Sequence, residues 1–369
     1  MTQDGDSLEF VTLTGSPYDR GVTHGDRFAT EIEANVNRYL DKFAHYDIPA
    51  KRARELANEF IPLIDEAAPA YATEMRGIAD GSGVPLEDIS LLNARYEITY
   101  GAYADAADDT SPRRTDGCTS FGLRGPAVDD EGPYIGQNWD WIPDIDVFIM
   151  GVEQPDAPNH IALTEAGIVG GKIGVNEHGI GMVLNGLVSA MDGEQTFRTP
   201  YHVRFRNVLN ATRLSKSIGA LIETDRACSA NVLLGNDVGE LVNLEILPES
   251  ANYLYPSDGV LTHANHIEGG KGDSQLERIL PDTICRGPRL RRLFTTAQSD
   301  LSMPDIEAAL RDHVDNPTSI CRHRDPAAPT QERSITRVSA ILGLTERQIS
   351  ATNGPPCQAS YQDYTLSDI

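Results

Sequence analysis

Apolar side chains recur with helical spacing through the first part of the chain. Phe28, Ile32 and Val36 follow the 3.6-residue period, which predicts an amphipathic helix over 24–44. Further helices are expected over 50–60, over 63–80 and from Pro85 and Leu86 onward. The first 105 residues are therefore predicted to be mainly helical, and the polar stretch over 104–116 is predicted to be an exposed loop.

From residue 118 the pattern changes to short apolar or alternating segments separated by Gly, Asn and Asp. This pattern is typical of strands that are joined by tight turns. Strands are expected over 118–124, 133–139, 159–165, 172–176, 179–185, 230–235 and 240–246, with two more inside 334–351 around a turn at 343–347. The clearest hairpin spans 172–185 and turns at Asn176 to Gly179.

Two more helices, over 200–223 and 304–313, are predicted between these strands. Helices followed by strands with helices between them predict an α+β fold, in which helices pack against antiparallel sheets. The order does not fit a dinucleotide-binding fold. Four glycines precede a hairpin instead of opening a helix, which favours tight turns and close packing over a phosphate cradle; these are Gly167, Gly170, Gly171 and Gly174.

The chain is strongly acidic, with a formal net charge of −24. We therefore expect no binding to nucleic acid or to anionic membrane surfaces. Many carboxylates and only five lysines are what adaptation to high salt would produce, and an ordinary acidic protein remains the alternative. The polar segment 1–15 does not resemble a signal peptide, and no run reaches the roughly 18 apolar residues of a membrane helix, so a cytoplasmic location is expected.

The five cysteines are scattered and odd in number, which argues against a disulfide framework. No CxxC or HxxxH pair indicates a metal site. A ligand set can be assembled only by combining distant residues, namely His263, His266, Cys321 and His323. We therefore expect no metal and no cofactor.

Cys118 is the strongest candidate for catalysis. A buried core thiol is the ordinary interpretation of a lone cysteine. Here the cysteine begins a strand directly after the expected loop, and Gly117 before it has no side chain to block attack on its carbonyl group. A second strand, Gly136 to Trp141, ends close to a carboxylate at Asp140.

These two stretches, Asp-Gly-Cys-Thr at 116–119 and Gly-Gln-Asn-Trp-Asp at 136–140, resemble the penicillin-biosynthesis (isopenicillin N) acyltransferase family of N-terminal nucleophile hydrolases. Other stretches resemble that family in the same order, at 21–25, 94–97, 165–187, 262–266, 312–323, 336–339 and 354–357. The resemblance covers about residues 15 to 357. It implies a four-layer αββα sandwich in which antiparallel sheets are flanked by helices.

The resemblance also implies a precursor that cuts itself between Gly117 and Cys118. The Cys118 thiol would attack the Gly117 carbonyl, and water would open the resulting thioester. Residues 1–117 would become a mainly helical chain, and residues 118–369 a catalytic chain of the same domain. The freed α-amino group, with a reference pKa of about 7.7–8.0, would then act as base for the thiol, with a reference pKa of about 8.5.

By the same resemblance, Asp140 orients the freed amino group. The Asn265 side-chain amide and the Asn185 backbone N–H would stabilise the oxyanion, an interaction worth roughly 2.7–4 kcal/mol per donor. Supporting positions are Thr119, Gln137, Asn138 and Ser339. In the bile-salt hydrolase and acid ceramidase relatives an arginine stands at the position of Gln137. This chain therefore resembles the penicillin acyltransferase type, and it lacks that arginine as a cation for binding an acidic substrate.

The expected activity is hydrolysis or acyl transfer at amide bonds of small N-acyl compounds, either penicillin-like or acylated amines and amino acids, through a Cys118 thioester. The expected partner is a small N-acyl substrate, with acyl-CoA as a candidate donor, and a homo-oligomer is compatible with the sequence. Two alternatives stay open. The chain is a binding protein that retains the fold without catalysis, or a cysteine protease that uses His263 or His313 as base.

Overall fold

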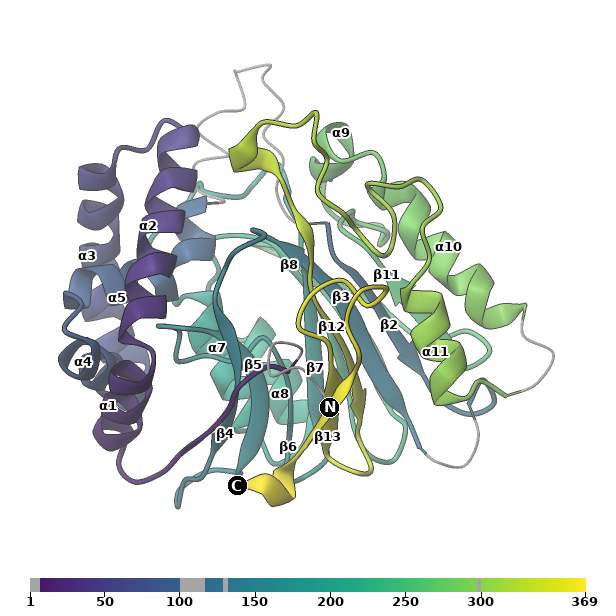
Figure 1. Ribbon diagram of the computed structural model, residues 1–369, viewed down its shortest axis with the longest axis horizontal. Helices are drawn as coiled ribbons and strands as arrows, with labels where there is room; N and C mark the ends of the chain where they lie inside the picture. The colour runs from purple at the N-terminus through teal and green to yellow at the C-terminus, as the bar shows by residue number, and fades with distance from the viewer. Residues whose placement is uncertain (1–6, 100–116, 129–131, 297–299) are drawn as a thin grey trace.

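The computed structural model describes residues 7–99, 117–128, 132–296 and 300–369 (Figure 1). The expected loop over 104–116 lies outside these ranges. The helices are α1 (Pro17–Arg27), α2 (Ala29–His45), α3 (Ala50–Ala67), α4 (Pro69–Ser82), α5 (Leu86–Asn93), α7 (Tyr201–Leu209), α8 (Leu214–Ile222), α9 (Leu276–Ile279), α10 (Thr283–Thr295) and α11 (Met303–Leu310), with 3-10 turns η1 (Thr330–Glu332) and η2 (Leu366–Asp368).

The strands form two sheets. Their bounds are β1 (Phe10–Leu13), β2 (Thr119–Leu123), β3 (Tyr134–Trp141), β4 (Val147–Val152), β5 (His160–Glu165), β6 (Ile173–Asn176), β7 (Gly181–Gly186), β8 (Ala230–Gly235), β9 (Leu241–Ile246), β10 (Ala251–Leu254), β11 (Val260–His263), β12 (Ile335–Gly343), β13 (Gln348–Ala351) and β14 (Gln362–Thr365). One sheet has the order β1-β4-β5-β6-β7-β8-β9-β10 and the other β11-β2-β3-β12-β13-β14. Every pairing among these strands is antiparallel except that of β1 with β4.

The two sheets pack face to face. Ile135 of β3 and Leu344, which follows β12, lie against Gly181 of β7 in the other sheet. All three belong to buried segments, and the apolar side chains between the sheets form one core. The strands read as almost continuously buried runs because both faces of each sheet are covered.

Helices cover both outer faces (Figure 1). Helices α1–α5, α7 and α8 lie on the side of the eight-stranded sheet, and α10 and α11 lie on the six-stranded sheet. This confirms the α+β class and the four-layer αββα sandwich. Because β1 pairs with β4, the segment before residue 117 and the segment after it contribute strands to the same sheet.

Most predicted strands are confirmed to within one or two residues. In the hairpin of β6 and β7, Asn176 fixes the turn because its side-chain oxygen accepts from the backbone N–H groups of His178 and Ile180. The glycine interpretation also fits: a Cβ atom on Gly170 would lie 2.1 Å from the carbonyl oxygen of His202, so the backbones approach closely there.

Several helix boundaries differ from the predictions. The helix expected over 24–44 is broken at Phe28, whose ring stacks on Phe148 with 4.3 Å between centroids. Helix α3 continues through the exposed Pro62. The break comes instead at Ala68, where the following proline disfavours helical backbone.

The helix expected over 200–223 is two helices, α7 and α8. Asn176 explains the interruption, since its side-chain amide donates to the carbonyl oxygens of Leu209 and Ala211 at the end of α7. These carbonyls are satisfied outside a helix, so the chain can turn there.

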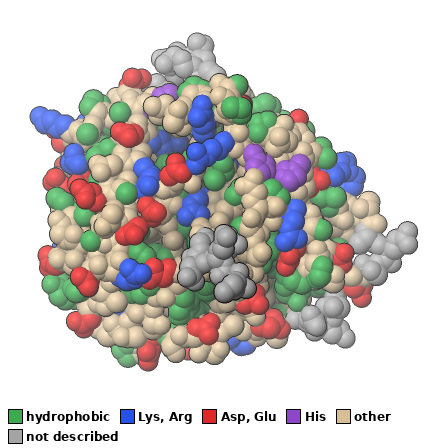
Figure 2. Space-filling model, in the orientation of Figure 1, with side chains coloured by type: hydrophobic (Ala, Val, Ile, Leu, Met, Phe, Trp, Pro, Cys, Tyr) green, Lys and Arg blue, Asp and Glu red, His purple; other side chains and the backbone are tan. Residues whose placement is uncertain are grey.

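Acidic and basic side chains are interspersed over the face that Figure 2 shows. Within the described segments, no helix is both long enough and apolar enough to cross a membrane.

Candidate active site

Cys118 lies immediately before β2 and is fully buried. Its side chain belongs to the core between the sheets, together with Trp139. Its sulfur is 3.9 Å from the carbonyl oxygen of Asp140. The ammonium group of Lys172 lies over the Trp139 ring, 4.4 Å from its centroid, and forms an ion pair with Glu165. Burial lowers the pKa of Lys172 to about 7, although Glu165 and the charge of Cys118 raise it.

The carboxylate of Asp140 is held firmly at the end of β3. Thr336 donates its hydroxyl to Oδ1 at 2.7 Å, and Arg322 donates Nε–H to Oδ2 at 3.1 Å. The side chain is fully buried. Burial raises the pKa of Asp140 to about 7, against the opposing effects of Arg322 and Arg286.

A buried chain of alternating charges connects Asp140 to Cys118. Arg322 also pairs with Asp282, and Asp282 pairs with Arg286 at 2.9 Å. Arg286 then donates Nη1–H to the Cys118 carbonyl oxygen at 2.5 Å. Both arginines are at most 3% exposed, so burial costs them the free energy of hydration. Attraction to the neighbouring carboxylates largely offsets this cost.

Neither arginine was singled out as a site residue from the sequence. Two signals existed: Asp282 and Arg286 have the i,i+4 spacing of a helical ion pair, and Arg322 lies inside the stretch 312–323 that resembles the family. Their common target could not be inferred, because it depends on how the start of α10 and the loop before β12 meet at β3.

Of the two predicted asparagines, Asn185 contacts Cys118 directly and Asn265 is joined to it through Arg286. Asn185 donates its side-chain Nδ2–H to the Cys118 carbonyl oxygen at 3.3 Å, while its backbone lies in β7 opposite Asn231 of β8. The Asn265 side-chain oxygen accepts from Arg286 at 2.9 Å, and its Nδ2–H donates to the Gly186 carbonyl oxygen at 3.0 Å. Their contribution to oxyanion binding stays a prediction.

Three of the supporting residues share one row across the six-stranded sheet. Asn138 of β3 lies in register between Thr119 of β2 and Ser339 of β12. Thr119 accepts from Arg286 at 2.7 Å, so it is joined to the charge network. Asn138 donates to the carbonyl oxygens of Leu310 and Ile320 and thereby ties α11 and the following loop to the sheet.

The other contacts of the supporting residues are structural. Ser339 is hydrogen-bonded to the Tyr361 hydroxyl at 2.6 Å. Gln137 points to the opposite side of β3 and accepts from the backbone N–H of Leu184 at 2.6 Å, which links the two sheets.

Gly117 is closely covered by Arg322. A Cβ atom at position 117 would lie 2.4 Å from the Arg322 Nη2 atom. Gly117→Ala is therefore expected to displace Arg322 from Asp140 and to destabilise the fold by about 1–3 kcal/mol, measured by urea unfolding. Gly270→Ala is the matched control, because no atom lies within 4 Å of a Cβ atom there. Equal stability of the two variants would contradict this packing.

His263 is not placed to act as a base. Its Nδ1 lies 2.8 Å from the Ala264 carbonyl oxygen and its Nε2 lies 2.9 Å from Glu245. Both partners are acceptors, so both ring nitrogens donate and neither accepts a thiol proton. Burial lowers the pKa of His263, but the Glu245 hydrogen bond and the charges of Glu268 and Glu245 raise it above its usual 6.5 overall.

This pair predicts a pH dependence of stability. Because the pKa of His263 is raised in the fold, its contribution is fully present below pH 6.5 and is lost as the pH rises through the raised value. The melting temperature of the wild type should exceed that of His263→Gln most at pH 6 and less at pH 9, whereas the exposed His178→Gln should show no such trend. A constant difference across this range would contradict the assignment.

The metal set considered from the sequence is not brought together as a unit. His263 pairs with Glu245, whereas Cys321 and His323 lie beside two residues outside that set, His313 and Cys357.

The sequence comparisons identify the family of the chain. Residues 128–351 match the family described as acyl-coenzyme A:6-aminopenicillanic acid acyl-transferase, and the chain belongs to this family. The matched segment includes Asp140, Asn185 and Asn265. It begins after Cys118, which therefore lies outside it.

A relative in Emericella nidulans, the acyl-coenzyme A:6-aminopenicillanic-acid-acyltransferase 40 kDa form, is 29% identical over 320 residues, which are 85% of this chain and 84% of the relative. An uncharacterized protein of Archaeoglobus fulgidus is 26% identical over 210 residues, 51% of this chain and 34% of that protein.

Solved structures with a similar chain course include a Caenorhabditis elegans N-acylethanolamine-hydrolyzing acid amidase ortholog, with a TM-score of 0.48 and 15% identity over 62% of this chain and 93% of that chain. Another is penicillin V acylase from Agrobacterium tumefaciens, with a TM-score of 0.42 and 13% identity over 63% of this chain and 82% of that chain.

Proposed function

We propose that this chain is a self-cleaving hydrolase or acyltransferase that acts on amide bonds of small N-acyl compounds through a thioester on Cys118. The observation that carries the proposal is the charge network that joins the Cys118 carbonyl oxygen, through Arg286, Asp282 and Arg322, to the carboxylate of Asp140. Membership of the acyltransferase family supports the reaction class.

In the proposed self-cleavage, the Cys118 sulfur attacks the Gly117 carbonyl carbon. The C–N bond between the two residues breaks, the thiol proton passes to the departing nitrogen, and a Gly117 thioester forms. Water then hydrolyses the thioester, which gives the Gly117 carboxylate and restores the thiol. Residues 1–117 and 118–369 would remain together, since β1 and β4 pair across the cut.

After cleavage the α-amino group and the thiol would belong to one residue. Asp140 would orient that amine, because its backbone oxygen already lies near the sulfur and its carboxylate is fixed by Arg322 and Thr336. Asn265 would donate to the oxyanion once its amide exchanges the Gly186 carbonyl oxygen for the substrate oxygen.

The acyl group of the substrate would pass to the sulfur and then to an acceptor. Water as acceptor gives hydrolysis, and an amine gives acyl transfer. The name of the Emericella nidulans relative contains both acyl-coenzyme A and 6-aminopenicillanic acid, so acyl-CoA is included among the candidate donors to be tested.

The test is to incubate the protein with N-acyl amino acids, N-acylated 6-aminopenicillanic acid and acyl-CoA, and to record mass spectra on quenching. The expected result is an acyl adduct on the peptide that begins with Cys118, removable by hydroxylamine, together with release of amine or CoA. Turnover of these compounds with the adduct on another residue would overturn the proposal, and so would absence of both adduct and turnover across the panel.

A further inference from the structure

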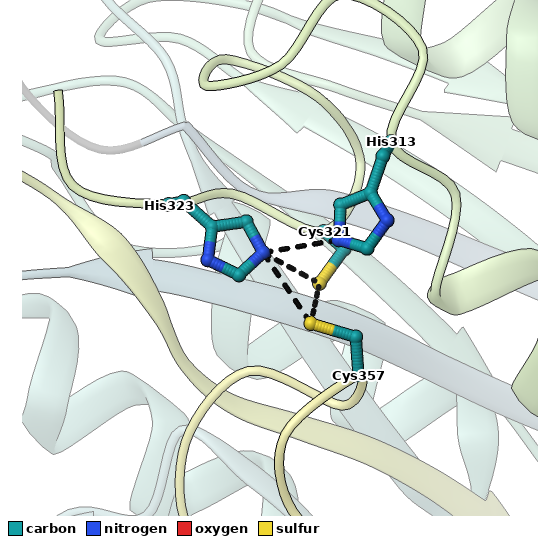
Figure 3. Close-up of side chains that lie close together, drawn as sticks. All are labelled: His313, Cys321, His323 and Cys357. Carbon is teal, nitrogen blue, oxygen red and sulfur yellow. Dashed lines mark hydrogen bonds between the residues drawn. The ribbon is translucent and has the colours of Figure 1, made fainter.

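Four side chains with metal-binding donor atoms converge on the α11 side of the molecule: His313, Cys321, His323 and Cys357 (Figure 3). They come from separate parts of the chain. One histidine follows α11, the second histidine and one cysteine lie in the loop before η1, and the other cysteine lies between β13 and β14. One donor atom from each residue lies within 4.8 Å of all the others.

Four of the six donor-to-donor distances lie close to the edges of a tetrahedron around zinc, and all six are within 4.8 Å. With Zn–S of about 2.3 Å and Zn–N of about 2.0–2.1 Å, a tetrahedral site has edges of about 3.8 Å between two sulfurs, about 3.4 Å between two nitrogens and about 3.6 Å between sulfur and nitrogen. The two sulfurs are 3.6 Å apart and the two histidine Nε2 atoms 3.0 Å apart. His323 Nε2 lies 3.7 Å from the Cys321 sulfur and 3.3 Å from the Cys357 sulfur.

Hydrogen bonds from two backbone N–H groups and one arginine side chain hold the three loops in this arrangement. The N–H of Cys321 donates to the Asp312 carbonyl oxygen, and the N–H of His323 donates to that of Pro317, both at 3.0 Å. Arg311 donates to the Pro356 carbonyl oxygen at 2.9 Å, beside the second cysteine. The ligands would therefore not have to be gathered from distant positions when a metal binds.

We propose that His313, Cys321, His323 and Cys357 form a structural Zn²⁺ site. Two thiolates and two imidazoles in tetrahedral geometry select zinc over hard cations such as Mg²⁺ or Ca²⁺, which prefer oxygen ligands. Four protein ligands leave no open position, so the metal stabilises the loops and takes no part in catalysis. His313 and Cys357 are exposed, which gives the ion a path from solvent.

The site lies next to the catalytic network along the chain. Arg322, which pairs with Asp140 and Asp282, stands between the ligands Cys321 and His323. Zinc would fix this loop at both neighbours of the arginine. The proposal itself does not depend on the proposed enzymatic function, because it rests on the four donor atoms alone.

His side chains gather at one place on the face in Figure 2.

The sequence did not predict the site because His-x₇-Cys-x-His, with the second cysteine 34 residues after His323, does not match the short paired spacings of common zinc motifs.

The test is a metal titration of the full chain, stripped with a chelator and kept reduced with a phosphine. We expect one equivalent of Zn²⁺ to bind and to raise the melting temperature, and Co²⁺ to give tetrahedral ligand-field bands with thiolate charge transfer. Cys357→Ser and His313→Ala should weaken binding on the order of 100-fold.

Cys285→Ser is the matched control, because this exposed cysteine lies on α10, outside the cluster, and its loss should leave the stoichiometry unchanged. Absence of stoichiometric binding by the reduced wild type would overturn the proposal. Equal binding by Cys357→Ser would do the same, and so would conversion of Cys321 and Cys357 to a disulfide in protein that takes up no zinc.

Discussion

Cys118→Ala is expected to leave the chain in one piece and to lower its activity on N-acyl compounds by a factor on the order of 10⁴ or more. The substitution removes the atom that forms both the self-cleavage thioester and the acyl-enzyme. Its effect on stability should be small, since only one buried sulfur is lost. Activity is measured as amine release, and integrity by denaturing electrophoresis.

Cys228→Ala is the control for this experiment. Cys228 is also fully buried, so the same atoms are removed from a similar environment away from the network. The control should be cleaved and active. A Cys118→Ala protein that is cleaved, or whose activity lies within tenfold of the control, would rule out the nucleophile.

Arg322→Met is expected to lower the free energy of unfolding by about 3–5 kcal/mol, because it leaves the buried carboxylates of Asp140 and Asp282 without a shared cation. Arg322→Lys should fall between the wild type and Arg322→Met. Lysine keeps the charge but not the planar group that reaches both carboxylates. Urea unfolding with a two-state fit gives the differences.

Arg324→Met provides the comparison. Arg324 also pairs with an aspartate, Asp144, at 2.7 Å, but the two side chains are 51% and 67% exposed. Loss of such a surface pair should change stability by no more than about 1 kcal/mol. If both methionine variants lost the same stability, the network would not hold the site together as described.

The sequence pattern predicted the α+β class and most of the strands because its strongest signals are local, whereas the four-layer sandwich was implied by the family resemblance. Apolar alternation, turn residues and the Asn176 turn fix most strands within a residue or two. What it missed depends on tertiary contacts. The break at Phe28 is associated with stacking on Phe148, and the end of α7 with an amide from the far end of β6. Strand β4, Val147–Val152, was not predicted because it is a short apolar run without alternation. Such a run is equally compatible with a buried strand and a buried helix.

The residues of the candidate site also fall into those that the sequence predicted and those that only the tertiary structure reveals. Cys118, Asp140, Asn185 and Asn265 were found from short motifs, and the structure brings all four into one buried region. The charges that connect them were not found. Arg286 and Arg322 are 36 residues apart in the sequence and meet only because both approach Asp282.

The proposed chemistry depends on cleavage of the bond between Gly117 and Cys118, which the intact mass of the purified wild-type protein reports. We expect two polypeptides, with the masses of residues 1–117 and 118–369, that elute together under native conditions. A single polypeptide of full mass in a preparation that turns over N-acyl compounds would contradict it, because that catalysis would proceed without a free amine at Cys118.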